Sequence, residues 1–409
     1  MFEFKRVSLA FLTASTLPVF ALTTATSKLP TSTIVVPLTR NVGLSAYYAE
    51  FQVGTPPQKV LLKVDTGSPR YAFLDPRNPS CVSGSTACTT FGTFDNLTSS
   101  TCRYVESGFQ DALVDYGSGD YLRDTFKLGG VSVEDMFFGY TSFFAFSSHV
   151  YPPISTIAGL SLECQFGGPG CDGKGAYLLP ELKNASAIDY MSVSFYLGPD
   201  EANITSAQMI LGGAYDKAKV DGELFTVNMV DPRDAELANS QTNSVNVTAM
   251  EFVSDGGNRT SETYGEKNVG VPVLLDTGVA SWYMTKLIFN AVFAALGGSG
   301  EPNRASPYQP VDCKYRDSSY SKSYLSVQFG TAGAIKVPLN SLVTKFADGT
   351  CGSFIYARGD TLSTFGVAFL RSAYIIYDQE NLCVSLGQVK HSNKTEVVAF
   401  PKGGFKPSP

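Results

Sequence analysis

Two short runs in the sequence place an aspartate at the end of an apolar segment and directly before Thr-Gly. Residues 60–67 read Val-Leu-Leu-Lys-Val-Asp-Thr-Gly, and residues 272–278 read Pro-Val-Leu-Leu-Asp-Thr-Gly. Glycine lets backbone N–H groups approach a carboxylate, and a threonine hydroxyl can brace the turn by bonding to backbone. A single such turn is explained as well by a structural strand end. Two copies favour a functional pair, Asp65 and Asp276.

A pseudo-twofold relation between two halves of the chain would bring Asp65 and Asp276 face to face. Two carboxylates in contact do not both ionise easily, so the pair holds one proton over an acidic range. The ionised member then acts as a general base on water while the protonated member polarises a carbonyl. This chemistry hydrolyses an amide without a metal ion, a nucleophilic serine or a cofactor, and we expect none of these.

The two triplets belong to a longer internal repeat. Each is followed downstream by an apolar segment that contains a glycine: Gly159 lies 94 residues after Asp65, and Gly366 lies 90 residues after Asp276. A duplicated lobe explains these nearly equal offsets better than coincidence. A chain of 409 residues is also long enough to form two hydrophobic cores.

The elements that would position these turns are mostly strands. Short segments with β-type composition, separated by turn residues, span 47–53, 59–64, 120–128, 192–197, 224–229, 271–275, 324–329 and 373–377. Helical periodicity is clearest over 285–296, where Gly297-Gly298 ends it. We therefore predict an all-β, bilobal fold with a few short helices.

Composition and charge exclude some partners. Charged residues make up only 17% of the chain, the formal net charge is −6, and no basic run or stripe is visible. Nucleic acid and anionic membrane surfaces attract basic proteins, so we expect neither as a partner. The 28 Phe and 21 Tyr residues fit a strand-rich protein.

The N-terminus has the pattern of a secretory signal. Lys5 and Arg6 precede a mostly apolar run over 7–20, and residues 19–21 offer a cleavage site. A membrane anchor is the alternative, but the run is shorter than the roughly 20 residues that a span needs. We expect a secreted, extracellular protein without a membrane anchor.

An oxidising compartment changes how the eight cysteines are interpreted. Cys81 and Cys88 flank a small loop, as do Cys164 and Cys171, whereas Cys313 and Cys351 lie in the C-terminal half. Cys102 and Cys383 are left over, and sequence alone selects no connectivity. A zinc site is the competing interpretation, but His149 and His391 are isolated and no Cys-x-x-Cys occurs.

Six Asn-x-Ser/Thr sequons are candidate glycosylation sites in a secreted chain. They begin at Asn96, Asn184, Asn203, Asn246, Asn258 and Asn393.

Five motifs, in order, resemble those of pepsin-like aspartic proteases of the secreted, fungal type, over residues 45–390. They are the opening strand and turn at 47–58, the active-site turns at 65–68 and 276–278, the flap tip at 116–119, and the C-terminal signature at 368–378. Each motif alone is modest evidence. Their order and spacing together identify the chain as a member of this family.

The resemblance implies roles for individual residues. Asp65 and Asp276 would be the catalytic pair, supported by Thr66, Gly67, Ser68, Thr277 and Gly278, while Tyr116, Gly117, Ser118 and Gly119 would form the substrate-covering flap. Cys81–Cys88 and Cys313–Cys351 fall where the family places disulfides, and Cys164–Cys171 is a further candidate pair. Polypeptides would be the substrates. A monomer suffices, because the two lobes already supply both aspartates.

The resulting domain prediction has five parts. Residues 1–21 are a signal peptide, 22–44 a short leader or pro-segment, 45–200 the N-terminal lobe, 201–395 the C-terminal lobe, and 396–409 a polar tail.

Two departures from the family pattern bear on pH. Val279 stands where the family usually has Ser or Thr, so Asp276 would lack a hydroxyl donor, which pushes a carboxylate pKa upward. Val367 stands where the family often has an aspartate, and losing that negative charge acts in the opposite direction. We expect a shifted pH optimum whose direction the sequence leaves open.

A third departure concerns the segment after the first turn. The family's tryptophan is absent there, and Arg70 is either a cleft-edge charge that selects acidic substrate residues or a solvated surface arginine. The alternative to an active enzyme is a catalytically silent pepsin-like binding or inhibitor glycoprotein. Such members usually lose an Asp or Gly of one triplet, and both triplets are intact here.

Overall fold

The computed structural model describes residues 32–42, 45–82, 86–110, 118–143, 157–161, 175–200, 206–230, 243–266, 269–298, 308–360 and 362–407. Several predicted features lie outside these ranges: the signal peptide, the flap residues Tyr116 and Gly117, the candidate pair Cys164–Cys171, and the sequon at Asn203.

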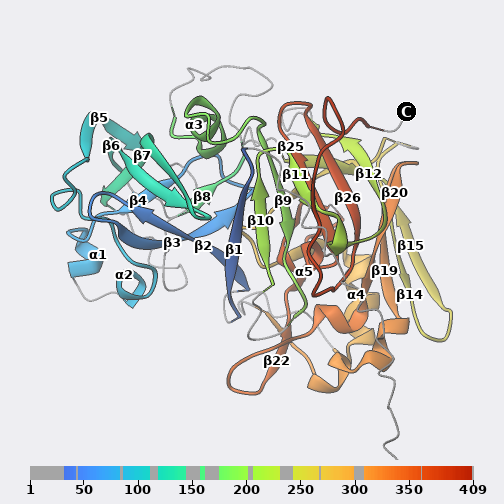
Figure 1. Ribbon diagram of the computed structural model, residues 1–409. Coiled ribbons are helices and arrows are strands. Elements are labelled where there is room, and N and C mark those ends of the chain that lie inside the picture. The colour runs from blue at the N-terminus through green and yellow to red at the C-terminus, as the bar shows by residue number, and fades with distance from the viewer. Residues whose placement is uncertain are drawn as a thin grey trace, which may run out of the picture.

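The chain folds into two lobes that lie on either side of a shared set of strands (Figure 1). The N-terminal lobe, at the left of Figure 1, is built largely from strands of one half of a 13-stranded sheet. Its elements are β2 (Ala46–Val53), β3 (Gln58–Asp65), β4 (Ala72–Leu74), α1 (Pro79–Val82), α2 (Thr86–Phe91), β5 (Arg103–Gln110), β6 (Ser118–Leu128), β7 (Val131–Phe143), β8 (Ile157–Gly159) and α3 (Leu178–Asn184).

The strands between the lobes continue the same sheet, in the order β12-β26-β25-β9-β10-β1-β2. They are β1 (Ile34–Asn41), β9 (Ser192–Tyr196), β10 (Gln208–Leu211), β12 (Val220–Asn228), β25 (Ala373–Asp378) and β26 (Cys383–Val389). Two short elements lie beside them: the 3-10 turn η1 (Lys217–Lys219), and the two-stranded pair of β11 (Ala214–Asp216) and β27 (Val397–Ala399).

The described part of the C-terminal lobe contains three further sheets and two α-helices. Its strands are β13 (Ser244–Val247), β14 (Ala249–Val253), β15 (Arg259–Thr263), β16 (Val271–Leu275), β17 (Trp282–Met284), β18 (Gln309–Pro310), β19 (Tyr324–Phe329), β20 (Gly333–Pro338), β21 (Thr344–Lys345), β22 (Cys351–Ser353), β23 (Ile355–Ala357) and β24 (Thr364–Phe365). Its helical elements are α4 (Lys286–Ala295), η3 (Cys313–Arg316), η4 (Ser318–Lys322), η5 (Leu339–Leu342) and α5 (Val367–Leu370).

The sequence repeat corresponds to a structural repeat. In the first half, β3 runs parallel to β8 and Asp65 lies opposite Gly159; in the second half, β16 runs parallel to β24 and ends beside Asp276. The N–H of Gly159 donates to the carbonyl five residues beyond Asp65, and the N–H of Gly366 donates to the carbonyl five residues beyond Asp276. Each half therefore carries the same strand–turn–strand unit around its aspartate.

The strand predictions agree with this fold. Each predicted segment overlaps a strand, and β16 and β19 have the predicted bounds. The helix predicted over 285–296 is α4, whose buried residues include Ile288, Phe289 and Val292. The all-β bilobal class with short helices is confirmed.

Segments at both ends of the described chain pair with strands of the fold. Residues 34–41, within the predicted leader, form β1 between β2 and β10, and Ile34, Val36 and Leu38 are buried. Part of the predicted polar tail forms β27, and Phe400 and Phe405 pack on each other and on Tyr215. Apolar residues within both segments are buried against the sheet, which ties the segments to the fold.

A buried ion cluster joins distant segments near β1. The Asp200 carboxylate contacts the guanidinium groups of Arg40 on β1 and Arg371 after α5, and it lies 2.6 Å from Nη1 of Arg316. Burial alone would raise the pKa of Asp200, but the three arginines together hold this pKa below its usual range. The cluster therefore links the first described strand to the C-terminal lobe.

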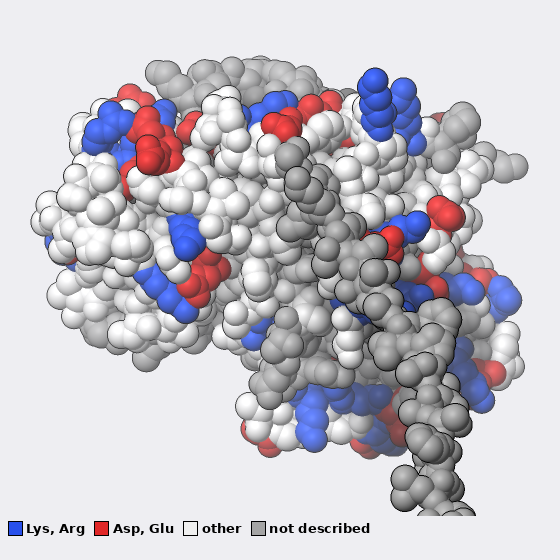
Figure 2. Space-filling model, viewed as in Figure 1, with Lys and Arg blue, Asp and Glu red and all other residues white. Residues whose placement is uncertain are grey.

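The surface carries charges of both signs. On the face shown in Figure 2, acidic and basic side chains are interspersed among a majority of uncharged residues. Among the helices of the described residues, none is long and apolar enough to cross a bilayer.

Candidate active site

The two predicted aspartates lie opposite each other at the junction of the lobes. Asp65 is the last residue of β3, and Asp276 directly follows β16. A side chain at Gly67 would collide with the Asp276 carboxylate, and one at Gly278 would collide with the Asp65 carboxylate. Each turn therefore needs glycine because the opposing carboxylate approaches its backbone closely.

Each carboxylate is also held within its own turn. The N–H of Gly67 donates to Oδ1 of Asp65 at 2.9 Å, and the N–H of Gly278 donates to Oδ1 of Asp276 at 2.7 Å. The Ser68 hydroxyl donates to Oδ2 of Asp65 at 3.0 Å. Position 279, the counterpart of Ser68, is valine, so the two aspartates have unequal hydrogen-bond environments.

The threonines of the two turns interlock. The N–H of Thr66 donates to the Thr277 hydroxyl at 3.1 Å, and the N–H of Thr277 donates to the Thr66 hydroxyl at 3.0 Å. Each hydroxyl donates in turn to the opposite strand, Thr66 to the carbonyl of Leu275 and Thr277 to the carbonyl of Val64. Both threonines are fully buried, so these four bonds fix the turns against each other.

Two further residues, which the sequence motifs did not assign to the site, stabilise this arrangement. The Tyr377 hydroxyl on β25 donates to the Leu275 carbonyl at 2.9 Å, and the Asn243 side chain donates to the Thr66 carbonyl at 2.8 Å. Tyr377 lies in the C-terminal signature motif, which was the available signal. Asn243 belongs to no motif, and only its position in the fold shows that it supports the turn at Thr66.

The electrostatics of the pair are asymmetric. Burial raises the pKa of Asp276 well above its ordinary value, and the negative charge of Asp65 raises it further. The Gly278 N–H and the Lys63 ammonium act in the opposite direction without cancelling these effects. Asp276 therefore holds its proton to higher pH than an ordinary aspartate does.

The two described residues of the predicted flap lie at the start of a strand. Ser118 and Gly119 are the first residues of β6, which pairs with β5, and a side chain at Gly119 would collide with the backbone of Tyr140. Arg70 donates to the carbonyl of Gln110, at the end of β5. Arg70, for which the sequence allowed two interpretations, thus contacts the end of β5.

Two of the predicted disulfides are present, Cys81–Cys88 and Cys313–Cys351. Cys102 and Cys383 are free thiols, and burial raises their pKa values to about 11 and about 12.

The described sequons differ in exposure. Asn184, Asn258 and Asn393 are exposed, whereas Asn246 on β13 is half-buried. The Asn96 side-chain oxygen accepts hydrogen bonds from Arg77 and Tyr140.

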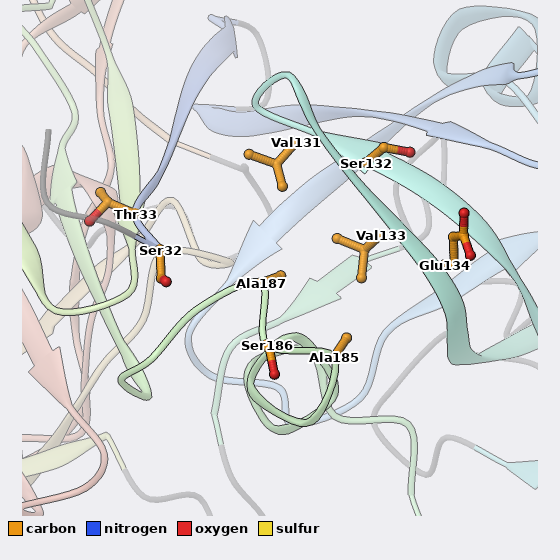
Figure 3. A pocket seen from close by; sticks show the side chains of 9 residues that line it. All are labelled: Ser32, Thr33, Val131, Ser132, Val133, Glu134, Ala185, Ser186 and Ala187. Atoms are coloured by element: carbon orange, nitrogen blue, oxygen red, sulfur yellow. The ribbon is translucent and has the colours of Figure 1, made fainter.

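A pocket of about 540 Å³ is lined by none of the predicted site residues. Figure 3 shows the side chains that line it. It is lined by residues that precede β1, start β7 and follow α3: Ser32, Thr33, Val131, Ser132, Val133, Glu134, Ala185, Ser186 and Ala187. Neither aspartate of the pair contributes to it. Within the ranges that the structure describes, no group of three His, Cys, Asp or Glu residues is placed to hold a metal ion.

Comparison with known proteins agrees with this geometry. The family model described as eukaryotic aspartyl protease matches residues 46–389, which include both Asp-Thr-Gly turns. The chain belongs to this family. Among its relatives, a probable aspartic-type endopeptidase, opsB, of Aspergillus oryzae is 29% identical over 367 residues, which cover 87% of this chain and 71% of the relative.

Two yeast relatives support the same family assignment. Aspartic proteinase yapsin-3 of Saccharomyces cerevisiae is 28% identical over 88% of this chain and 69% of its own length. Barrierpepsin of the same yeast is 25% identical over 86% of this chain and 61% of its own length. The matches confirm the predicted pepsin-like, fungal-type aspartic protease family.

Proposed function

We propose that this member of the aspartyl protease family is an active endopeptidase that hydrolyses peptide bonds at acidic pH, with Asp65 and Asp276 as its catalytic pair. The observation that carries the proposal is the opposition of the two carboxylates, each buried against the glycine of the other's turn. Two acids placed this way share a proton, which supplies a base and an acid in one site.

The unequal environments assign the roles. Asp65 accepts hydrogen bonds from Gly67 and Ser68, which favour its ionised form, so Asp65 is the base. Asp276 has the raised pKa and keeps the proton. Asp65 removes a proton from water as the water oxygen bonds to the peptide carbon, and Asp276 gives its proton to the carbonyl oxygen. Asp65 then gives the proton it took from water to the nitrogen, and the C–N bond breaks. As the carbonyl re-forms, a hydroxyl of the intermediate returns a proton to Asp276, and an acid and an amine are released.

Membership of the family supports a role for the flap and a class of substrate. In this proposal Tyr116, Gly117, Ser118 and Gly119 cover the bound peptide and exclude water. The substrates are polypeptides with apolar or aromatic side chains around the scissile bond. The protein works as a monomer, because one chain holds both aspartates.

Secretion is part of the same proposal. The N-terminal signal pattern, the exposed sequons and the two disulfides fit an oxidising, extracellular location. Two of the relatives are named as a probable aspartic-type endopeptidase and an aspartic proteinase, which supports enzymatic activity over the silent alternative.

The test is cleavage of a denatured protein at acidic pH, with and without a pepstatin-type inhibitor. We expect inhibitor-sensitive cleavage by the wild type and a loss of at least about 100-fold in Asp65→Asn, since general base catalysis contributes at least that much. Asp221→Asn, which changes an exposed carboxylate on β12, is the matched control and should keep full activity. A well-folded wild-type protein without inhibitor-sensitive cleavage would favour the silent binding protein instead.

A further inference from the structure

A lysine lies on the same strand face as one of the two aspartates. Lys63 is on β3 two residues before Asp65, and side chains two apart in a strand point to the same side. The alternate residues Val60, Leu62 and Val64 are fully buried in the core. Lys63 and Asp65 therefore both point away from this core.

The Lys63 ammonium connects the two active-site turns. Its Nζ donates to the carbonyl of Gly278 at 3.2 Å and lies 4.0 Å from Oδ2 of Asp65. The same Oδ2 accepts the hydrogen bond from the Ser68 hydroxyl. The Lys63 side chain is 21% exposed. Such partial burial reduces the screening of its charge by water.

This charge breaks the symmetry of the repeat. The position two residues before Asp276 is Leu274. The same positive charge therefore acts on both carboxylates, and the residue that carries it belongs to the N-terminal lobe.

The other titratable groups on this site do not replace that charge. Tyr48 on β2 lies directly opposite Lys63, and its ring stacks on Phe91. Tyr377 on β25 donates to the carbonyl of Leu275, and burial raises its pKa, so it is neutral at acidic pH. Neither tyrosine supplies a positive charge, whereas the Lys63 ammonium acts on the pKa of Asp276.

We propose that Lys63 is a positioning residue that holds a positive charge beside the carboxyl pair and thereby moves the pH range of peptide hydrolysis downward. A nearby cation favours ionised carboxylates, so it lowers the pH at which the pair loses its first proton and also the pH at which it loses its second. The bond to Gly278 keeps the ammonium in place. This inference rests on the proposed function.

The test compares pH profiles of kcat/KM, measured with a peptide substrate that has no titrating groups in the acidic range. In Lys63→Met, we expect both limbs of the profile to move to higher pH by about 0.5–1 unit, the scale of one partly screened charge at this distance. Lys63→Arg should keep the wild-type profile. Lys59→Met is the matched control, because Lys59 is an exposed lysine on the same strand, paired with Glu50.

A further variant separates charge from folding. Lys63→Gln keeps an N–H donor for the Gly278 carbonyl but lacks the charge, so it should shift the profile even if Lys63→Met folds poorly. Superimposable profiles for wild type and Lys63→Gln would overturn the inference, and so would a Lys63→Arg profile shifted as far as that of Lys63→Gln. If the wild type itself shows no inhibitor-sensitive cleavage, the proposed function has failed, which is a distinguishable result.

Discussion

Thr66 and Thr277 exchange reciprocal hydrogen bonds across the lobe junction, each backbone N–H donating to the other residue's hydroxyl at 3.0–3.1 Å. The two residues are 211 positions apart in the chain. Because neither lobe satisfies these buried groups by itself, correct hydrogen bonding of each Asp-Thr-Gly turn requires the other lobe.

Replacing one of these threonines should uncouple the turns. Thr277→Val leaves the Thr66 N–H and the Val64 carbonyl without their partner, at about 1–3 kcal/mol for each orphaned group. We expect the free energy of unfolding, measured with denaturant, to fall by that amount, and activity to fall with it. Thr277→Ser retains the hydroxyl and is the control. Equal stabilities for the Val and Ser variants would contradict the interlock.

The carboxyl pair should make stability depend on pH. The pKa of Asp276 is raised in the folded protein, so the folded state binds this proton more tightly than the unfolded state. Its contribution to stability is present below the ordinary aspartate pKa and is lost as pH rises through the raised value. In the wild type, the free energy of unfolding should therefore decrease as pH rises above the acidic range. In Asp276→Asn, which has no proton to lose at this position, that decrease should be smaller.

The readout for Asp276→Asn is denaturant unfolding at a series of pH values. Asp221→Asn is the control, because its exposed carboxylate should leave the wild-type pH dependence unchanged. A variant curve for Asp276→Asn that is parallel to the wild type at every pH would refute the linkage.

The Asp200 cluster has the opposite pH dependence. Because the folded pKa of Asp200 is lowered, its contribution is present above the ordinary pKa and is lost as pH falls through the lowered value. Asp200→Asn leaves the three arginines without this carboxylate, and we expect a cost of about 3–5 kcal/mol in unfolding free energy at neutral pH. Asp255→Asn, from an exposed pair with Lys322, should cost less than about 1 kcal/mol. Similar losses in both variants would argue against the cluster.

Strand β1 should be required for folding. Removing residues 1–44 deletes β1, leaves one edge of β10 and part of one edge of β2 unpaired, and loses burial of Ile34, Val36 and Leu38. We expect a loss of roughly 5 kcal/mol or more from this burial, observed as aggregation or a lower melting temperature. A chain that starts at residue 34 is the control and should fold. Equal melting temperatures for the two chains would instead support the predicted leader boundary at 44.

A hydroxyl at position 279 should change the pH range of activity. Val279→Thr supplies to Asp276 the kind of donor that Ser68 gives to Asp65, and a donor to the ionised form lowers a carboxylate pKa. We expect the upper limb of the kcat/KM profile to move to lower pH by about 1 unit. Val279→Ala lacks the donor and should retain the wild-type limb. Superimposable Thr and wild-type profiles would show that the hydroxyl does not reach Asp276.

Local sequence patterns were sufficient to predict much of the fold. Alternating or β-branched runs predicted strands such as β16 and β19 with their observed bounds, because strand geometry follows from nearest-neighbour sterics and the burial of alternate residues. The same information located Asp65 and Asp276, since a buried strand that ends in Asp-Thr-Gly is distinctive. Strand β1 was missed because Arg40 and Pro37 interrupt its apolar pattern, although Arg40 is in fact buried beside Asp200.

The sequence by itself thus determined the strands, the two aspartate turns and the repeat that relates them. Only the tertiary structure decided what crosses between the halves: the exchange between Thr66 and Thr277, the reach of Lys63 to Gly278, and the inequality of the two carboxylates. The physical reason is the distance along the chain over which each kind of interaction acts. Strand and turn preferences act over a few neighbouring residues, whereas hydrogen bonds and pKa shifts between residues about 200 positions apart depend on how the two lobes pack.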